Sequence, residues 1–393
     1  MSGASMNDGR HASGPTPFDG GRRGRTERVR AIDLLRGLAV VVMIAVHLCD
    51  AFLPDRYRSH DLWHWVNILF GFVAPAFLFL SGVMTSWAVA RRRRDDRSPS
   101  DLIVRGFALL LVGFWLQLPS YSLRTILTLP DADALRAVDM NVLQVIGIGM
   151  ILLILLATVR KSSRISSVVL GSLALIIAAA TPWVSSFTVD EPVLSLLIGP
   201  DGSFPLSPNL GYVVAGCAAG PIIATMMRKR YSLQLMLAGG AVVILTQLWR
   251  MALPGDSFWE PGLPVVLFRL GGVVMAVGMV GAIVDRWVRI GSGLEERRRT
   301  VLERIGSMSL GIYVVHLIII YGSPMSIGLR AAFGGRFAGA IEPMVLLLLW
   351  PIVTLLGFWI VERWNAVGQR NPRLHRRLIW GWWIVVAEAL LLG

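Results

Sequence analysis

Ionisable side chains recur inside a long apolar run near the start of the chain. Asp33, Arg36 and His47 lie within residues 31–53, a run long enough to cross a bilayer. On a helix, Arg36 and His47 are about 20° apart around the axis and roughly 16 Å apart along it. Charged groups in hydrocarbon are costly, so they are functional candidates by default. We expect Arg36 to bind an anion, Asp33 to pair with it, and His47 to exchange protons, with Asp50 orienting its ring. The alternative is that Asp33 and Arg36 form a capping and snorkelling pair at the membrane interface.

A second polar stripe lies in the apolar run 305–322. Ser309, Tyr313 and His316 are spaced at i, i+4 and i+7, which places them on one helix face. The segment is expected to cross in the same direction as the first run, so His316 should lie at a depth similar to that of His47. Tyr313 and His316 then favour a site between the two helices. The alternative is a packing contact made through hydrogen bonds.

Three further groups of polar residues are candidates. Asp139 and Asn141 stand at the start of an apolar run, where helix capping by Asp139 is the alternative to substrate binding. Arg269 lies within another run and needs an anionic or carbonyl partner, either Glu260 or an acidic ligand. His60 is followed by His64 four residues later, a spacing that suits a metal on a helix. No third ligand accompanies this pair, so we expect aromatic anchoring at the interface and no metal.

The composition excludes a soluble protein. Apolar residues make up 54% of the 393 residues and charged residues only 16%, which leaves too little polar surface to keep the chain dissolved. The net charge of +13 does not indicate a nucleic-acid partner, because the basic residues sit in short clusters between apolar runs. Residues 1–30 lack an apolar core and are expected to form a disordered, basic cytoplasmic tail, followed by one transmembrane domain over 31–393.

The apolar runs predict an all-α, polytopic membrane helix bundle with about eleven transmembrane helices. Of the 38 Lys and Arg residues, 28 fall in loops on one side and six in loops on the other, which places the N-terminus in the cytoplasm. The expected spans are 31–53, 66–90, 102–118, 140–159, 166–187, 209–227, 233–251, 263–285, 305–322, 342–361 and 378–392.

Several of these stretches together resemble the transmembrane acyltransferase superfamily. They are Asp33-Leu-Leu-Arg36-Gly37 with the downstream His47, Phe72-Val-Ala-Pro75-Ala-Phe-Leu-Phe-Leu-Ser81-Gly82, Val138-Asp139-Met-Asn141, and Ser309-Leu-Gly-Ile-Tyr313-Val-Val-His316. Within the superfamily, the chain is similar to bacterial proteins with the heparan-alpha-glucosaminide N-acetyltransferase catalytic domain. The resemblance runs from about residue 30 to 365.

The resemblance implies transfer of an acyl group from cytoplasmic acetyl-CoA or another acyl-CoA to a sugar or other envelope acceptor. We expect a multi-pass protein of the bacterial inner membrane, in contact with lipid and without a metal or nucleic acid. His47 matches the first-span histidine of the acyltransferases, whereas the key histidine of the heparan enzyme lies in the following loop, where His60 and His64 stand here.

The catalytic candidates are therefore His47, His60 and His316, and which of them reacts stays open. The expected substrate-binding residues are Asp33, Arg36, Asp139, Asn141, Glu260, Arg269 and Tyr313. The alternative function is a transporter or flippase for a small anionic or glycolipid substrate, since intramembrane Arg, His and Asp suit a carrier as well. The lack of an internal repeat speaks against it.

Overall fold

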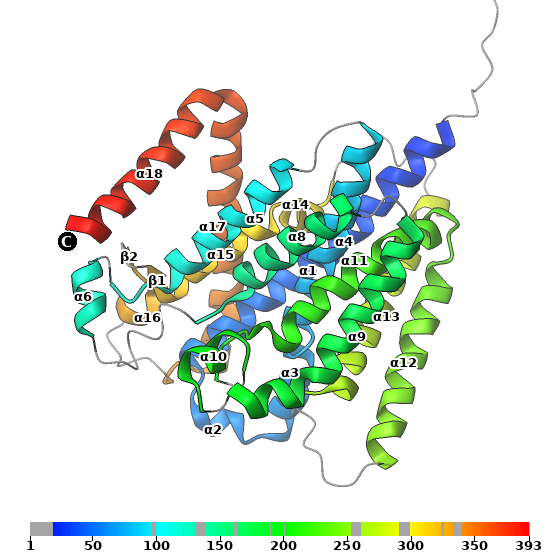
Figure 1. Ribbon diagram of the computed structural model, residues 1–393, viewed down its shortest axis with the longest axis horizontal. Helices are drawn as coiled ribbons and strands as arrows, with labels where there is room; N and C mark the ends of the chain where they lie inside the picture. Colours follow the sequence, from blue (N-terminus) through cyan, green and yellow to red (C-terminus); the bar gives the residue numbers. More distant parts are fainter. Residues whose placement is uncertain are drawn as a thin grey trace, which may run out of the picture.

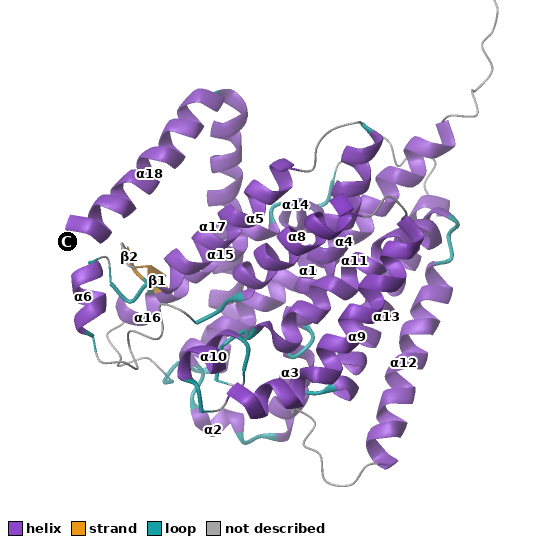
Figure 2. Cartoon of the chain, in the orientation of Figure 1, coloured by secondary structure: helices purple, strands orange, loops and turns teal. Residues whose placement is uncertain are grey.

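A computed structural model describes residues 19–95, 100–120, 122–129, 139–159, 163–188, 190–199, 201–252, 261–290, 299–323, 326–332 and 339–392. Apart from the short hairpin of β1 (Gly322–Ser323) and β2 (Ser326–Ile327), the regular elements in these ranges are helices (Figure 2). They pack side by side as one bundle, with α12 and α18 at its opposite sides (Figure 1). The all-α membrane helix bundle expected from the sequence is confirmed.

The long helices carry the bundle. They are α1 (Asp19–Phe52), α4 (Val73–Arg94), α5 (Ser100–Gln117), α8 (Val142–Val159), α9 (Ser163–Thr188), α11 (Leu206–Arg228), α12 (Ser232–Ala252), α13 (Leu263–Ile290), α15 (Ser309–Tyr321), α17 (Pro343–Arg370) and α18 (Pro372–Leu392). The short helices are α2 (Asp55–Arg58), α3 (Asp61–Phe70), α6 (Leu123–Thr128), α10 (Pro192–Leu197), α14 (Val301–Ser307) and α16 (Leu329–Ala332). α1 begins at Asp19, within the segment expected to be a tail.

Nine of the eleven expected spans each fall on one helix, whereas the span 66–90 covers the end of α3 and most of α4, and the span 305–322 is divided between α14 and α15. Not every one of these helices is long and apolar enough to cross a membrane. In the described ranges seven helices qualify by length and composition, and the pair α14–α15, bent by 86°, makes an eighth. α8 is a shorter apolar helix, and α18 carries basic residues in its first turns. The number eleven therefore stays a prediction.

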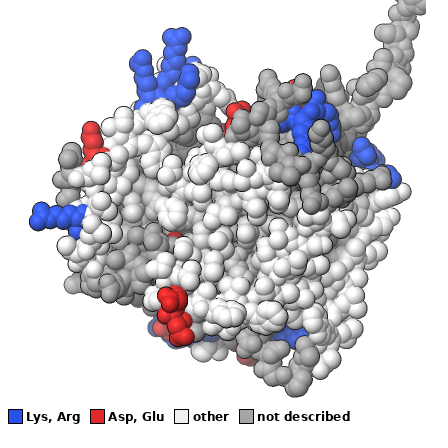
Figure 3. Space-filling view, viewed as in Figure 1, with Lys and Arg blue, Asp and Glu red and all other residues white. Residues whose placement is uncertain are grey.

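The surface of the bundle matches a bilayer environment. Apolar side chains of α12 such as Leu245 and Met251 are 64% and 84% exposed. Figure 3 shows a broad, largely uncharged face between charged groups, most of them basic, along its upper margin and charged groups along its lower margin. The start of α1 and the ends of α4 and α17 lie toward the upper edge in Figure 1, and four arginines end α4 there. A soluble monomer rarely exposes so large an apolar surface, whereas lipid covers it without cost.

Close helix contacts form where a glycine leaves room for the backbone of its neighbour. A Cβ on Gly216 of α11 would lie 1.9 Å from the carbonyl oxygen of Phe79 on α4. One turn further along α11, a Cβ on Gly220 would meet the Ser86 hydroxyl of α4. The Gly216–Gly220 spacing thus serves packing inside the chain, as small residues at i and i+4 do in membrane helices.

The contact between α1 and α14 positions the candidate site. A Cβ on Gly306 would lie 1.7 Å from the carbonyl oxygen of Asp33, and one on Gly37 would lie 2.2 Å from that of Leu302. The start of α14 is fixed by a capping box between Thr300 and Glu303. α14 thus rests directly on the backbone of α1, and α15, which leaves α14 at a bend of 86°, contacts α1 further along its length.

Candidate active site

One part of the site is a network of charged and polar groups around Arg36. Its guanidinium donates a hydrogen bond of 2.6 Å to the Ser309 hydroxyl and lies 3.8 Å from the Asp33 carboxylate. Arg299 approaches the other oxygen of Asp33 at 3.9 Å. The pairing of Asp33 with Arg36 is as expected from their spacing, and two guanidinium groups share one carboxylate. The network therefore carries a net positive charge and suits an anionic ligand.

The second part of the site, around His47, is a cluster of aromatic and imidazole rings. The ring centroids of His47 and His316 are 5.2 Å apart, and the Tyr313 ring lies 5.4 Å from His316. His316 is completely buried, and His47 is partly exposed. Since Ser309 contacts Arg36 and His316 faces His47, α15 and α1 run in the same direction. The equal depth of the two histidines, expected from the sequence, agrees with this arrangement.

The hydrogen bonds of His316 determine what its ring can do. Nδ1 lies 3.0 Å from the carbonyl oxygen of Ile312, an acceptor, so Nδ1 must carry the proton. In the neutral ring Nε2 is then an acceptor. It is buried and has no hydrogen-bond partner in the described part of the chain. A buried acceptor without a donor is costly, so this atom is suited to a ligand that brings an O–H or N–H group.

Tyr321, which the sequence analysis missed, is the partner of His47. Its hydroxyl lies 3.2 Å from the His47 carbonyl oxygen and 3.4 Å from His47 Nδ1. Asp50, expected to orient this imidazole, lies instead 4.0 Å from Arg58. Tyr321 stands 120° around the helix from Ser309, outside the polar stripe, so periodicity does not select it. The only signal in the sequence is a tyrosine at the end of an apolar run.

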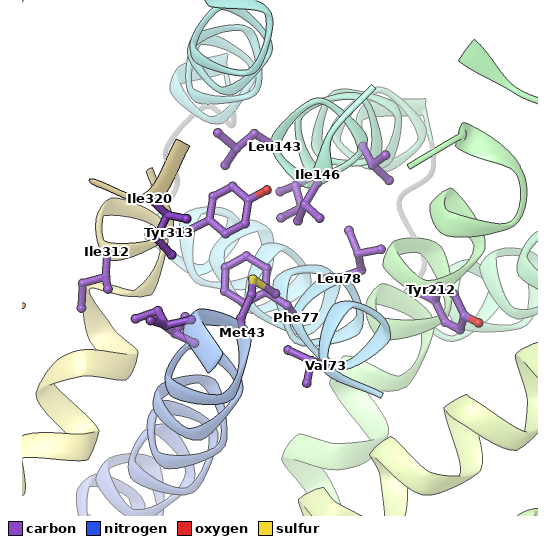
Figure 4. Close-up of a cluster of buried hydrophobic side chains, with 14 of the residues drawn as sticks. Met43, Val73, Phe77, Leu78, Leu143, Ile146, Tyr212, Ile312, Tyr313 and Ile320 are labelled. Carbon is purple, nitrogen blue, oxygen red and sulfur yellow. The ribbon is translucent and has the colours of Figure 1, made fainter. Parts of the chain in front are cut away.

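Tyr313 is held by aromatic packing. Its ring stacks on Phe77 of α4 with the centroids 5.9 Å apart, and it is 2% exposed. Figure 4 shows Tyr313 and Phe77 beside Met43 of α1, with Leu143 and Ile146 of α8 around the tyrosine hydroxyl. Side chains of four helices thus fix the wall on which His316 lies.

A groove of about 760 Å³ runs between α15 and α17 and includes Arg36. Its walls are mainly apolar and reach Val314 and Val315, the residues that precede His316. The sequence led us to expect a tunnel from Arg36 to His47. The groove provides an opening at the Arg36 end, and a continuous passage to His47 stays a prediction.

Asp139 and Asn141 are engaged in structural contacts. The Asp139 carboxylate accepts hydrogen bonds from the backbone and hydroxyl of Ser203 at 2.9 and 2.5 Å. Asn141 caps α8 by accepting from the Leu143 N–H at 2.8 Å, while Gln144 accepts from the Asn141 N–H. This arrangement is the reciprocal capping expected at a helix start. Substrate binding by these two residues stays a prediction that the contacts do not require.

The other expected site residues lie outside the buried cluster. His60 precedes α3 on the surface, with its ring 6.2 Å from Tyr57, and His64 is exposed beside Trp65. Arg269 of α13 lies near the buried Tyr212 hydroxyl. Glu260 falls outside the described residues. Among the residues that the structure does describe, no group of three His, Cys, Asp or Glu side chains is arranged to hold a metal.

Comparison with known proteins bears on the candidate residues of the first half of the chain. The family model of the heparan-alpha-glucosaminide N-acetyltransferase catalytic domain matches residues 28–255. A search of curated proteins found no match. The matched range contains Arg36, His47 and His60, whereas Tyr313 and His316 lie beyond it. Because the match spans more than half of the chain, the protein belongs to the heparan-alpha-glucosaminide N-acetyltransferase catalytic family, a family of membrane acetyltransferases.

Proposed function

We propose that this protein transfers an acetyl group from acetyl-CoA to a sugar or other envelope acceptor, with His47 and His316 at the reaction centre. The observation that carries this proposal is the buried Nε2 of His316 beside the His47 ring, an atom for which the described residues provide no hydrogen-bond partner. The family supplies the reaction class, and the paired imidazoles supply a site able to accept protons in a membrane interior.

The donor binds from the cytoplasmic side of a bacterial plasma membrane. The positive-inside rule, applied to the basic loops, puts the N-terminus on that side. Arg36, with the nearby Arg299, attracts the phosphates of CoA, and Asp33 and Ser309 hold the Arg36 guanidinium in place. The pantetheine arm extends from this end toward the histidines, a span of roughly 16 Å along α1. This route uses the polar groups that α1 and α15 turn toward each other.

In the reaction, the acceptor hydroxyl or amine attacks the thioester carbonyl carbon. His47 takes the proton from the attacking atom, the carbon–sulfur bond breaks, and the same proton passes to the CoA thiolate. His316 Nε2 accepts a hydrogen bond from a neighbouring hydroxyl or a second N–H of the acceptor and so orients it. A neutral His316 with its Nδ1 proton bound to Ile312 has no proton left for an oxyanion, so the Tyr313 hydroxyl is the donor proposed for that role.

Membrane vesicles from cells expressing the chain test this proposal with acetyl-CoA labelled in the acetyl group. His47→Ala and His316→Ala should each lower label transfer to glycan and lipid fractions by about 100-fold or more. His11→Ala, in the N-terminal segment and outside every proposed site, is the control and should retain wild-type transfer. Undiminished transfer in both buried-histidine variants would overturn the proposal, and so would loss confined to His60→Ala.

A transporter is distinguished by a separate measurement. Arg36→Gln should raise the KM for acetyl-CoA while leaving the protein folded, because it removes the anion-binding charge near the CoA phosphates. Uptake of a small anion or glycolipid into proteoliposomes in the absence of acyl-CoA, together with no label transfer, would favour the carrier.

A further inference from the structure

The groove between α15 and α17 has the form of a lipid site that opens sideways. Trp359 and Trp364, which line it on α17, are 52% and 41% exposed, so the groove is open at the surface of the bundle. Its floor is formed by Leu310, Val314 and Val315 of α15. In a bilayer, such an opening faces acyl chains and not water.

The part of the groove from Arg363 toward the basic end of α17 is polar and positively charged. Arg363 and Asn365 line it there, whereas Arg36, which also lines the groove, is held by Asp33 and Ser309 and is assigned to the acetyl donor. The Arg363 guanidinium lies over the Trp359 ring at 5.8 Å, and within the described ranges no carboxylate pairs with it. The neighbouring Glu362 is bound by Arg304. The end therefore keeps an excess of positive charge that an anionic headgroup can complement.

The groove covers part of the depth of one leaflet. Its α17 residues run from Trp359 to Val367, eight positions or roughly 12 Å along the axis. Arg363 lies four positions from each end of this stretch, so roughly 6 Å of it, from Arg363 to Trp359, lies at the depth of the acyl chains. One leaflet has a hydrocarbon depth of about 15 Å, so an acyl chain would extend past Trp359 onto the lipid-facing surface. Val367 is near the end of α17 where the basic residues lie, and Trp359 is nearer to the middle of the helix. A positively charged group at the depth of the lipid headgroups and apolar side chains at the depth of the acyl chains are what a single bound phospholipid requires.

We infer that this groove binds one anionic phospholipid of the leaflet on the Arg363 side. The phosphate lies by Arg363 and Asn365, and an acyl chain lies along Val314 and Val315. The inference concerns lipid recognition and does not depend on the proposed acetyl transfer.

Native mass spectrometry of the whole chain tests this inference, with the purified protein exposed to phosphatidylglycerol or phosphatidylcholine. The wild-type protein should retain one phosphatidylglycerol in preference to phosphatidylcholine. Val314→Trp fills the groove and should abolish this retention, and Arg363→Gln should lower the preference about five-fold. Leu248→Trp and Arg228→Gln, at exposed positions of α12 and α11, are the matched controls and should behave as wild type.

The possible outcomes distinguish a bound phospholipid from acetyl-CoA as the occupant of the groove. Arg363 is exposed, so Arg363→Gln should fold and keeps the test valid even if Val314→Trp does not. Equal preference for phosphatidylglycerol in wild type and Arg363→Gln would overturn the inference. Complete displacement of the lipid from the wild type by acetyl-CoA would also overturn it, because the groove would then belong to the donor.

Discussion

Replacing Gly306 with alanine should separate α1 from α14 and disturb the site without touching any proposed reacting group. The new Cβ would lie 1.7 Å from the Asp33 carbonyl oxygen, and Cβ contacts below 3.0 Å do not occur in practice. The helices therefore have to move apart by roughly 1.3 Å, because backbone atoms cannot give way as a flexible side chain does. Overpacking of this kind typically costs about 1–3 kcal/mol.

The displacement reaches the polar network one turn away. If Arg36 and Ser309 separate by the same amount, their hydrogen bond of 2.6 Å lengthens to roughly 3.9 Å and is lost. A shift of about 1 Å in the positioning of reactants can lower a rate by about 100-fold. We expect Gly306→Ala to lower both the thermal midpoint and the rate of acetyl transfer.

Thermal unfolding in detergent micelles and label transfer in vesicles measure the two effects. Gly171→Ala on α9 is the matched control, because a Cβ there meets nothing within 4 Å. It removes a glycine from a helix and should raise stability by about 0.5–1 kcal/mol with transfer unchanged. A Gly306→Ala protein with wild-type midpoint and activity would refute the close contact between α1 and α14 and the placement of α15 that depends on it.

Three further substitutions test single contacts. Tyr321→Phe removes the hydroxyl beside His47 and should lower kcat for acetyl transfer about 10-fold with a stability change near 1 kcal/mol; an unchanged kcat would contradict a positioning role. Asn141→Ala removes the cap of α8 and a buried hydrogen bond to α5, so the thermal midpoint should fall by the equivalent of about 1–3 kcal/mol, and a wild-type midpoint would speak against it. Ser309→Ala frees the Arg36 guanidinium and should raise the KM for acetyl-CoA several-fold with kcat near wild type, whereas unaltered kinetics would argue against donor binding there.

Interactions that depend on residues close in sequence could be predicted well. A chain in hydrocarbon must satisfy its backbone hydrogen bonds internally, so apolar runs of sufficient length had to become helices. The helical period then placed Arg36 and His47 on one face of α1, and the pair Asp33–Arg36 followed from a spacing of three residues. The common direction of the first and ninth expected spans also indicated that His316 would lie level with His47.

Contacts between residues distant in sequence were decided only by the tertiary structure. Tyr321 reaches His47 across 274 positions, and nothing in the local pattern distinguishes it from an interfacial aromatic anchor. The roles of Asp139 and Asn141 were open because a polar residue at a helix start can cap the helix or face a ligand, and only the placement of Ser203 and α5 shows which partners are near. The sequence by itself determined the helices and the faces that carry polar groups. How those faces meet depends on side-chain packing and on glycine contacts such as Gly306 against Asp33, which the order of residues alone does not reveal.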